Sequence, residues 1–209
     1  EGIDRIRISS IEPNLLTDQI IKYCAQSEIF MPHFHVPLQS GSNKILRKMK
    51  RRYRKENYEA RVKKIKSNIP DACVGADVIV GFPGETEDDF LETHNFLNEL
   101  EISYLHVFTF SERSNTVAVE MGEVVPKEIK DERSKMLHIL SDKKRRHFND
   151  QFINKNRPVL FENIKNGKIL GHTDNYIQVQ VKTESNFLNT IQDVKLIDNH
   201  STFVVGDIV

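Results

Sequence analysis

The eleven residues ADVIVGFPGET, numbered 76–86, decide the fold that we expect for this chain. The first five are almost all apolar, which is typical of a buried strand. Gly81 and Gly84 follow in a turn, where the absence of a Cβ lets a ligand approach the backbone closely. Thr86 then has the character of a helix N-cap, and the acids after it suit the positive end of a helix dipole. The stretch predicts a strand, a glycine turn and a helix in direct succession.

The same alternation of strand and helix extends over the first 150 residues. Further strands are expected at residues 3–10, 33–38 and 104–110. A helix before the central strand has apolar residues spaced by four, three and four positions, at Tyr58, Val62, Ile65 and Ile69. Strands that alternate with helices lie parallel and are joined by crossovers, so we expect an α/β domain over residues 1–150.

Residues 151–209 have a different pattern. They lack helical periodicity and contain short β-rich runs at residues 159–161, 177–181, 194–197 and 203–209. Glycines separate several of these runs, as is common in small all-β domains. We therefore expect a second domain over residues 151–209, in the form of a five-stranded β-barrel.

Composition excludes several classes of protein. No apolar run is long enough to span a bilayer, and no signal peptide opens the chain, so we expect a cytoplasmic protein without a membrane partner. Cys24 and Cys73 match no metal or redox spacing. His33 and His35 alternate on one expected strand, but the sequence offers them no third ligand, so no metal site is predicted. Motifs of serine hydrolases, zinc proteases and P-loop enzymes are absent.

The charge is unevenly distributed although the formal net charge is zero. Residues 44–66 contain twelve Lys or Arg and two acids, whereas residues 85–101 contain seven acids and no Lys or Arg. A basic cluster also ends the last expected helix. Such a separation of charge is typical of a surface that binds a polyanion, although helix faces exposed to solvent would explain it equally. The candidate RNA contacts are Lys50, Arg51, Arg52, Lys143, Lys144, Arg145 and Arg146.

A ligand site is expected where the parallel strands end. The carboxyl ends of such strands share one edge, and ligands of α/β folds bind there. Ser10, Glu12 and Gln39 could bond to ribose hydroxyls or an amino group, while Gly81 and Gly84 leave space. Strand-to-helix turns also require glycine and capping residues for structural reasons, so each turn taken alone is weak evidence.

Five short stretches are distinctive: residues 5–13 (RIRISSIEP), 35–42 (HVPLQSGS), 49–53 (MKRRY), 77–86 (DVIVGFPGET) and 104–111 (YLHVFTFS). In sequence, order and spacing they resemble the radical S-adenosylmethionine methylthiotransferases. The resemblance covers nearly the whole chain and implies three domains in the parent enzyme. Residues 1–150 would form the later part of a TIM-like partial β/α-barrel, the radical domain, and residues 151–209 an OB-like TRAM domain. An N-terminal methylthiotransferase domain would precede both.

The resemblance also implies cofactors and a substrate. The parent would use S-adenosylmethionine and two 4Fe-4S clusters; this chain, with two cysteines, would hold neither cluster and would be inactive alone. The residues expected to hold S-adenosylmethionine are Ser10, Glu12, Gln39, Ser40, Arg51, Ile79, Gly81, Gly84, Phe108 and Ser111. The partner would be the anticodon arm of tRNA.

Residues 9–13, SSIEP, resemble the branch that modifies threonylcarbamoyl-adenosine beside the anticodon. The alternatives within the family are isopentenyl-adenosine in tRNA and an aspartate of a ribosomal protein. Two alternatives from other classes stay open: an RNA-binding module without catalysis, and a β/α-barrel hydrolase or lyase that uses Glu12, Glu85 and the histidines.

Overall fold

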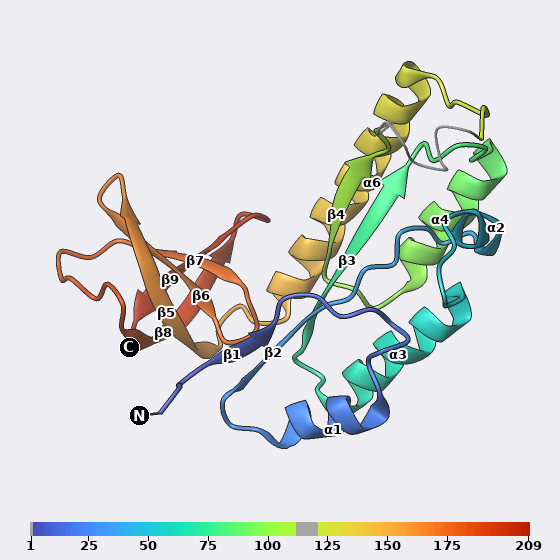
Figure 1. The fold of residues 1–209 in the computed structure, drawn as a ribbon. Coiled ribbons are helices and arrows are strands. Elements are labelled where there is room, and N and C mark those ends of the chain that lie inside the picture. The colour runs from blue at the N-terminus through green and yellow to red at the C-terminus, as the bar shows by residue number, and fades with distance from the viewer. Residues whose placement is uncertain (1, 112–120) are drawn as a thin grey trace.

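A parallel sheet of four strands organises the first part of the chain. In this computed structural model, which describes residues 2–111 and 121–209, the strands occur in the order β1-β2-β3-β4 (Figure 1). Their bounds are β1 Ile6–Ile8, β2 Phe30–His35, β3 Cys73–Val80 and β4 Tyr104–Thr109. All three neighbouring pairs are parallel, as the alternation of strand and helix predicted.

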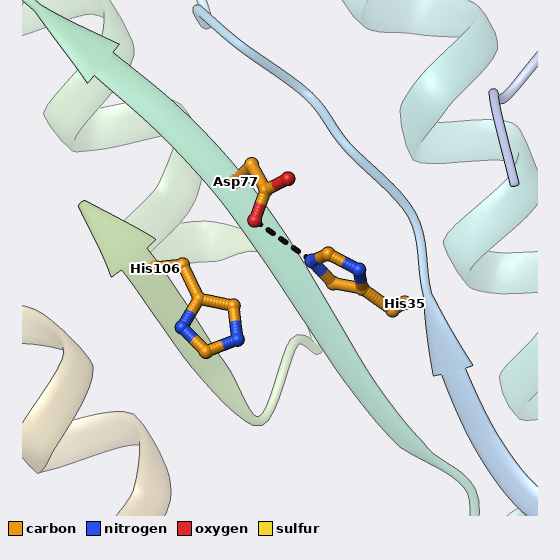
Figure 2. Close-up of side chains that lie close together, drawn as sticks. All are labelled: His35, Asp77 and His106. Carbon is orange, nitrogen blue, oxygen red and sulfur yellow. Dashed lines mark hydrogen bonds and ion pairs between the residues drawn. The ribbon is translucent and has the colours of Figure 1, made fainter. Parts of the chain in front are cut away.

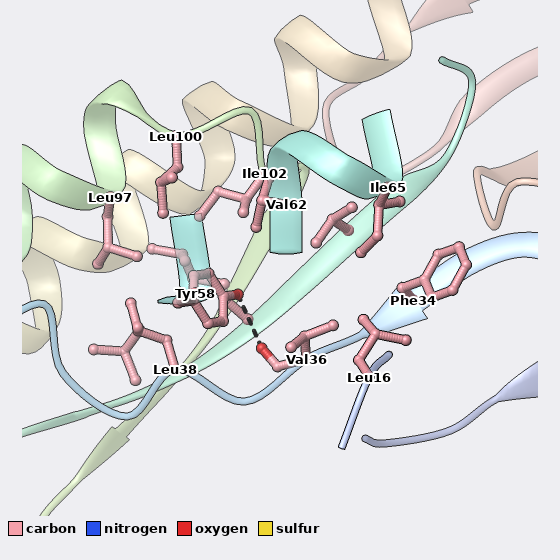
Figure 3. Packing of buried hydrophobic residues seen from close by; sticks show 14 of the residues in the cluster. Leu16, Phe34, Val36, Leu38, Tyr58, Val62, Ile65, Leu97, Leu100 and Ile102 are labelled. Carbon is pink, nitrogen blue, oxygen red and sulfur yellow. Dashed lines mark hydrogen bonds between the residues drawn. The ribbon is translucent and has the colours of Figure 1, made fainter. Parts of the chain in front are cut away.

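Helices connect these strands and build one core against the sheet. They are α1 Asp18–Gln26, α2 Asn43–Lys48, α3 Lys55–Asn68, α4 Glu87–Glu99 and α6 Lys127–Asp150. Thr86 caps α4 as expected, since its hydroxyl accepts a hydrogen bond from the Asp89 N–H. Tyr58 is fully buried and its hydroxyl donates to the Val36 carbonyl at 2.9 Å (Figure 3). The helical spacing at Tyr58, Val62 and Ile65 thus gives the buried face that it predicted.

The bounds of β1 and β2 differ from the sequence expectation. β1 covers only Ile6–Ile8, and β2 begins at Phe30 and ends at His35 rather than continuing to residue 38. After His35 the chain stays beside β3 through separate backbone bonds, from Val36 N–H to the Gly75 carbonyl and from Leu38 N–H to the Asp77 carbonyl. Gln39, with φ +74°, forms a single bridge to Val78. This departure from the ladder lets the chain turn toward α2.

The two faces of the sheet differ in chemistry. Apolar residues such as Phe34, Val78 and Leu105 face the helices and form the first core. The residues that alternate with them are polar or exposed: Arg7, His35, Asp77, His106 and Phe108. His106 and Phe108 are exposed, so this second face, which we call the open face, is accessible in the described part of the chain.

The second part of the chain is a closed barrel. Its strands are β5 Asn156–Lys165, β6 Lys168–Thr173, β7 Gln178–Val181, β8 Ile191–Asn199 and β9 Val204–Ile208, closed in the order β5-β6-β7-β9-β8. The predicted five-stranded barrel is confirmed, although β6 lay outside the predicted runs. Gly171 in β6 is required by close packing, because a Cβ there would meet the Leu160 carbonyl oxygen at 2.1 Å.

The barrel lies beside the starts of β1 and β2, and α6 runs from the far end of the sheet toward it (Figure 1). Arg157 connects the two parts, since it pairs with Asp71 at 2.6 Å before β3 and with Asp174 at 2.9 Å in the barrel. The barrel core also includes Cys73 and Tyr104 from the sheet. None of the helices in the described ranges is long and apolar enough to cross a membrane.

Candidate functional site

The expected ligand edge contains a small, mostly apolar cavity. It has a volume of about 260 Å³ and is lined by Lys48, Met49, Lys50, Arg51, Ile79, Phe82, Phe110 and Met121. Ile79 comes from β3, and Phe82 and Phe110 follow the ends of β3 and β4. Lys50 adopts φ +55°, which turns the chain after α2 and brings Arg51 to the cavity. This cavity joins two predicted site residues, Arg51 and Ile79.

Arg51 also joins this cavity to the end of β1. Its guanidinium lies 3.2 Å from the Glu12 carboxylate, and both side chains are partly exposed. The Arg51 Nε atom is buried and has no hydrogen-bond partner. A buried donor without an acceptor is unfavourable, so the arrangement fits a ligand that has a hydrogen-bond acceptor beside an apolar group. Glu12 and Arg51 are brought together although 39 residues separate them.

The two glycines of the turn have backbone conformations that favour glycine, and side chains of the same chain lie close to both. Gly81 and Gly84 adopt φ +74° and +75°, which disfavour other residues. A Cβ on Gly81 would meet the Lys130 side chain at 2.4 Å, and one on Gly84 would meet Glu123 and Lys48. Side chains of this chain therefore occupy the space where a Cβ would lie at both glycines, and Gly84 also lines a second cavity together with Lys48 and Glu123.

A buried ion pair fixes the same turn. The Arg133 guanidinium in α6 donates to the Glu85 carboxylate at 2.7 Å, and Gly81 N–H donates to the same oxygen at 2.7 Å. The two side chains are 5% and 1% exposed. Burial raises the pKa of Glu85, while Gly81 N–H and Arg133 oppose that rise. Arg133 was not predicted as a site residue. Its position on the apolar side of the helix could have indicated a buried arginine that needs an acidic partner.

The other predicted cofactor residues are scattered. Ser40 is buried, 3.2 Å from the Thr93 hydroxyl of α4, and accepts a hydrogen bond from Ser42 N–H. It therefore supports the fold and does not face the cavity. Ser10 and Ser111 are exposed, and Phe108 lies on the open face with 52% of its surface accessible.

Asp89 is the centre of a polar network beneath this edge. Its carboxylate accepts hydrogen bonds from Lys44 at 2.7 Å, Ser42 at 2.9 Å and Thr86 at 2.7 Å. Burial acts to raise the pKa of Asp89, but these hydrogen bonds lower it to about 2. The network ties the start of α2 to the start of α4.

The predicted RNA contacts fall into two separate groups. Lys50, Arg51 and Arg52 lie after α2, at the opposite end of the sheet from the end of α6 (Figure 1). In the second group, Lys144 donates to the Asn98 carbonyl at 2.8 Å, Arg145 lies over the Tyr104 ring and Arg146 donates to Ser201 at 2.9 Å. Most of the cationic groups near the end of α6 thus contact the protein itself.

The open face carries a row of polar side chains that crosses β2, β3 and β4. His35, Asp77 and His106 come from β2, β3 and β4 and point toward one another (Figure 2). His35 Nε2 lies 2.7 Å from Asp77, and this hydrogen bond raises the pKa of His35. Nearer the barrel, burial lowers the pKa of His33 to about 3, and its Nε2 lies 2.9 Å from the Tyr104 hydroxyl.

The two cysteines of the chain lie on different elements. Cys24 is in α1 and Cys73 is in β3, and both are buried. Burial raises the pKa of both thiols, which disfavours the thiolate that a cluster requires. These residues fit ordinary core positions.

Comparison with known proteins gives the following likenesses. The family model described as the Radical SAM superfamily matches residues 1–97. The threonylcarbamoyladenosine tRNA methylthiotransferase MtaB of Bacillus subtilis is 40% identical over 94% of this chain and 45% of its own length; that of Aquifex aeolicus is 42% identical over 86% and 43%. The tRNA-2-methylthio-N(6)-dimethylallyladenosine synthase of Caldicellulosiruptor saccharolyticus is 36% identical over 100% of this chain and 45% of its own.

Among solved structures, coproporphyrinogen III oxidase (HemN) from Escherichia coli, a radical SAM enzyme, aligns with a TM-score of 0.50 and 16% identity. The alignment covers 70% of this chain and 32% of that one, and at this identity it concerns the fold alone. The chain spans less than half the length of the curated relatives named above.

Proposed function

The chain belongs to the radical S-adenosylmethionine methylthiotransferase family, and from this premise we propose that it is the C-terminal part of an enzyme that methylthiolates threonylcarbamoyl-adenosine in tRNA, beside the anticodon. The observation that carries the proposal is the 40% identity to a relative of that named activity over 94% of the chain. The SSIEP run at residues 9–13 supports this branch over the dimethylallyladenosine branch.

We assign residues 1–150 to the radical domain and residues 151–209 to a TRAM domain. The one-sided covering of the parallel sheet by helices supports a part of a β/α-barrel, whose inner surface would be the open face. In the described part of the chain, β1 pairs only with β2, so further strands of a longer protein would extend the sheet at its other edge. Both iron–sulfur clusters would belong to that longer protein, and the present chain alone would be inactive.

The residues that would hold S-adenosylmethionine are those around the cavity at the C-terminal edge. Ile79 and Phe82 offer an apolar wall for the adenine ring, and Arg51 Nε offers a donor for an acceptor of the ligand. Glu12 orients the Arg51 guanidinium and can itself accept from a ribose hydroxyl. When bound, S-adenosylmethionine supplies radical chemistry at an unactivated C–H bond together with a reduced cluster, while the protein positions it.

Binding of S-adenosylmethionine to Arg51→Gln and Arg52→Gln chains tests this placement. The two arginines are neighbours of equal charge, but only Arg51 lines the cavity. A lost hydrogen bond to a charged group costs about 1.5–3 kcal/mol, so Arg51→Gln should weaken binding about tenfold or more in equilibrium dialysis. Arg52→Gln should bind as the unmodified chain does. Equal losses in both variants would remove the cavity as the cofactor site.

For tRNA, we propose that the turn after α2 supplies phosphate contacts, because Lys50 and Arg52 are exposed there. Each lost phosphate contact should reduce the slope of log affinity against log salt by about 1. The measurement compares three double variants: Lys50→Gln with Arg52→Gln, Lys143→Gln with Arg146→Gln, and Lys165→Gln with Lys168→Gln at the β5–β6 hairpin. The first should reduce the slope most.

An equal slope for all three variants would contradict the proposed contact. A reduced slope only for the hairpin variant would instead assign phosphate binding to the barrel. Binding of tRNA with no binding of S-adenosylmethionine by any preparation, including the complete enzyme, would favour the alternative of an RNA-binding module without catalysis.

A further inference from the structure

Three side chains on the open face have the composition of a metal site. His35, Asp77 and His106 each offer one ligand atom, and these atoms all lie within 4.8 Å of one another. They come from three neighbouring strands and converge on one point above β3 (Figure 2). Two imidazoles and one carboxylate form a donor set that binds first-row transition metals and leaves coordination positions open.

Strand register produces this convergence. Asp77 pairs directly with His106, and His35 pairs with Gly75, two residues before Asp77. Residues two apart on a strand share a face, so all three side chains point to the open face. Gly75 has no side chain, and a Cβ there would meet the Tyr104 ring at 2.3 Å. The Tyr104 ring occupies that space and contacts the His106 ring edge-on, with 5.1 Å between centroids.

The orientation of His35 matches that of a metal ligand. Its Nδ1 lies 2.9 Å from the Ser9 carbonyl oxygen, which only accepts, so Nδ1 carries a proton and donates it. Its Nε2 points to Asp77 Oδ1 at 2.7 Å. Histidines that bind metals usually donate their other ring N–H to a carbonyl or carboxylate in this way, which fixes the ring and its tautomer.

We propose that His35, Asp77 and His106 form a binding site for one divalent first-row transition metal ion, such as Zn²⁺, on the open face of the sheet. The proposal is independent of the function proposed above. Hard cations such as Mg²⁺ and Ca²⁺ prefer sites made of oxygen atoms alone, which two imidazoles disfavour. On binding, the metal replaces the Nε2 proton of His35, which leaves to solvent, and Asp77 exchanges its hydrogen bond for a coordinate bond.

The required movement is small. Ligand atoms that share one zinc lie about 3 Å apart, given zinc–ligand distances near 2 Å. His106 is the exposed member of the three and its side chain can rotate toward the other two. His35 and Asp77 have side chains 16% and 17% exposed, so a metal ion can reach them from the open face.

Calorimetric titration of the full chain with Zn²⁺ tests the proposal, with Co²⁺ absorption as a second readout of coordination. The variants are His106→Ala and Asp77→Asn, and the matched control is His138→Ala, an exposed histidine on α6. We expect one Zn²⁺ per chain, a binding constant lowered by about tenfold or more in both site variants, and an unchanged constant in the control. Zn²⁺ should also raise the Tm of the unmodified chain.

Circular dichroism of each variant without metal separates misfolding from lost coordination. Folded site variants that bind Zn²⁺ as tightly as the unmodified chain would overturn the proposal. So would a failure of the unmodified chain to bind Zn²⁺, or a loss of affinity in His138→Ala equal to that in His106→Ala. If Asp77→Asn fails to fold, His106→Ala alone decides, because His106 is exposed and outside the first core.

Discussion

In both the parallel sheet and the barrel, successive side chains of a strand point to opposite faces, but the two regions differ in what covers those faces. In the barrel, the sheet closes on itself, and the inward residues, among them Phe161, Val179 and Val194, fill a single core. In the first part, the sheet is open, and the apolar residues that form its core lie on the side that faces the helices. The alternate residues form the polar open face, where His35, Asp77 and His106 meet. In the closed barrel, one face of the sheet forms the core and the other faces solvent. In the open sheet, the face away from the helices is available for polar side chains that can bind a ligand.

The largest effect is expected from removing an aromatic side chain from each core. Phe34→Ala and Phe161→Ala should each cost about 3–5 kcal/mol, because both rings are completely buried. Hydrogen exchange followed by mass spectrometry reports the two regions separately. Phe161→Ala should increase exchange in the barrel and also at Cys73 and Phe148, which share its core. Phe34→Ala should leave the barrel protected. Equal loss of protection everywhere in both variants would mean that the two parts unfold as one unit.

Arg133→Met should have the next largest effect and should act on the sheet region only. It leaves the Glu85 carboxylate buried without its cationic partner, which costs about 3 kcal/mol. Urea denaturation measures this loss. Adding Glu85→Gln in the same chain should restore part of the stability, because the uncompensated charge is then gone. A double variant as unstable as the sum of the two single variants would contradict the ion-pair explanation.

Acidification should lower the stability of the contact between the sheet and the barrel, where His33 is buried, before it affects either hydrophobic core. Burial lowers the pKa of His33 to about 3, and the positive charges of Arg7 and His35 add to this effect. The folded state therefore binds fewer protons than the unfolded state between pH 6.5 and 3. Stability should fall as the pH decreases through that window, by up to about 1.4 kcal/mol per pH unit.

His33 touches both regions, since it bonds to Tyr104 and its ring lies 4.3 Å from that of Tyr176 in the barrel. Thermal unfolding from pH 7 to 4 should show a shallower decline in His33→Gln than in the unmodified chain. Identical pH profiles for the two would assign the decline to other groups.

The smallest effects should come from exposed ion pairs, and here the two regions should not differ. Glu59→Gln in α3 and Asp198→Asn in β8 each remove one partner of an exposed pair. Such pairs contribute about 0.5 kcal/mol or less, because water and salt screen them. Both variants should unfold within that margin of the unmodified chain. A loss of unfolding free energy above about 1 kcal/mol in only one of the two variants would contradict this prediction, because it would require further charged partners beyond the single ion pair.

Much of this fold could be predicted from local sequence. The ADVIVGFPGET stretch gave a strand, a turn and a capped α4, because burial, glycine and capping preferences act over a few neighbouring residues. The spacing of Tyr58, Val62 and Ile65 predicted the buried face of α3 for the same reason. The end of β2 was missed, because the regular pairing with β3 stops before the turn at Gln39, and pairing is a property of two strands together.

The sites depended on tertiary structure to a greater degree. The resemblance of short stretches to a known family identified Arg51 and Ile79 as site candidates, and the sequence showed His33 and His35 as alternating strand histidines without a third ligand. Only the folded structure decided that Glu12 reaches Arg51, that Lys130 fills the space beside Gly81 and that Arg133 pairs with Glu85. The sequence likewise could not join His35 to Asp77 and His106, because their meeting depends on strand register, and register is fixed by the packing of three strands against a common core.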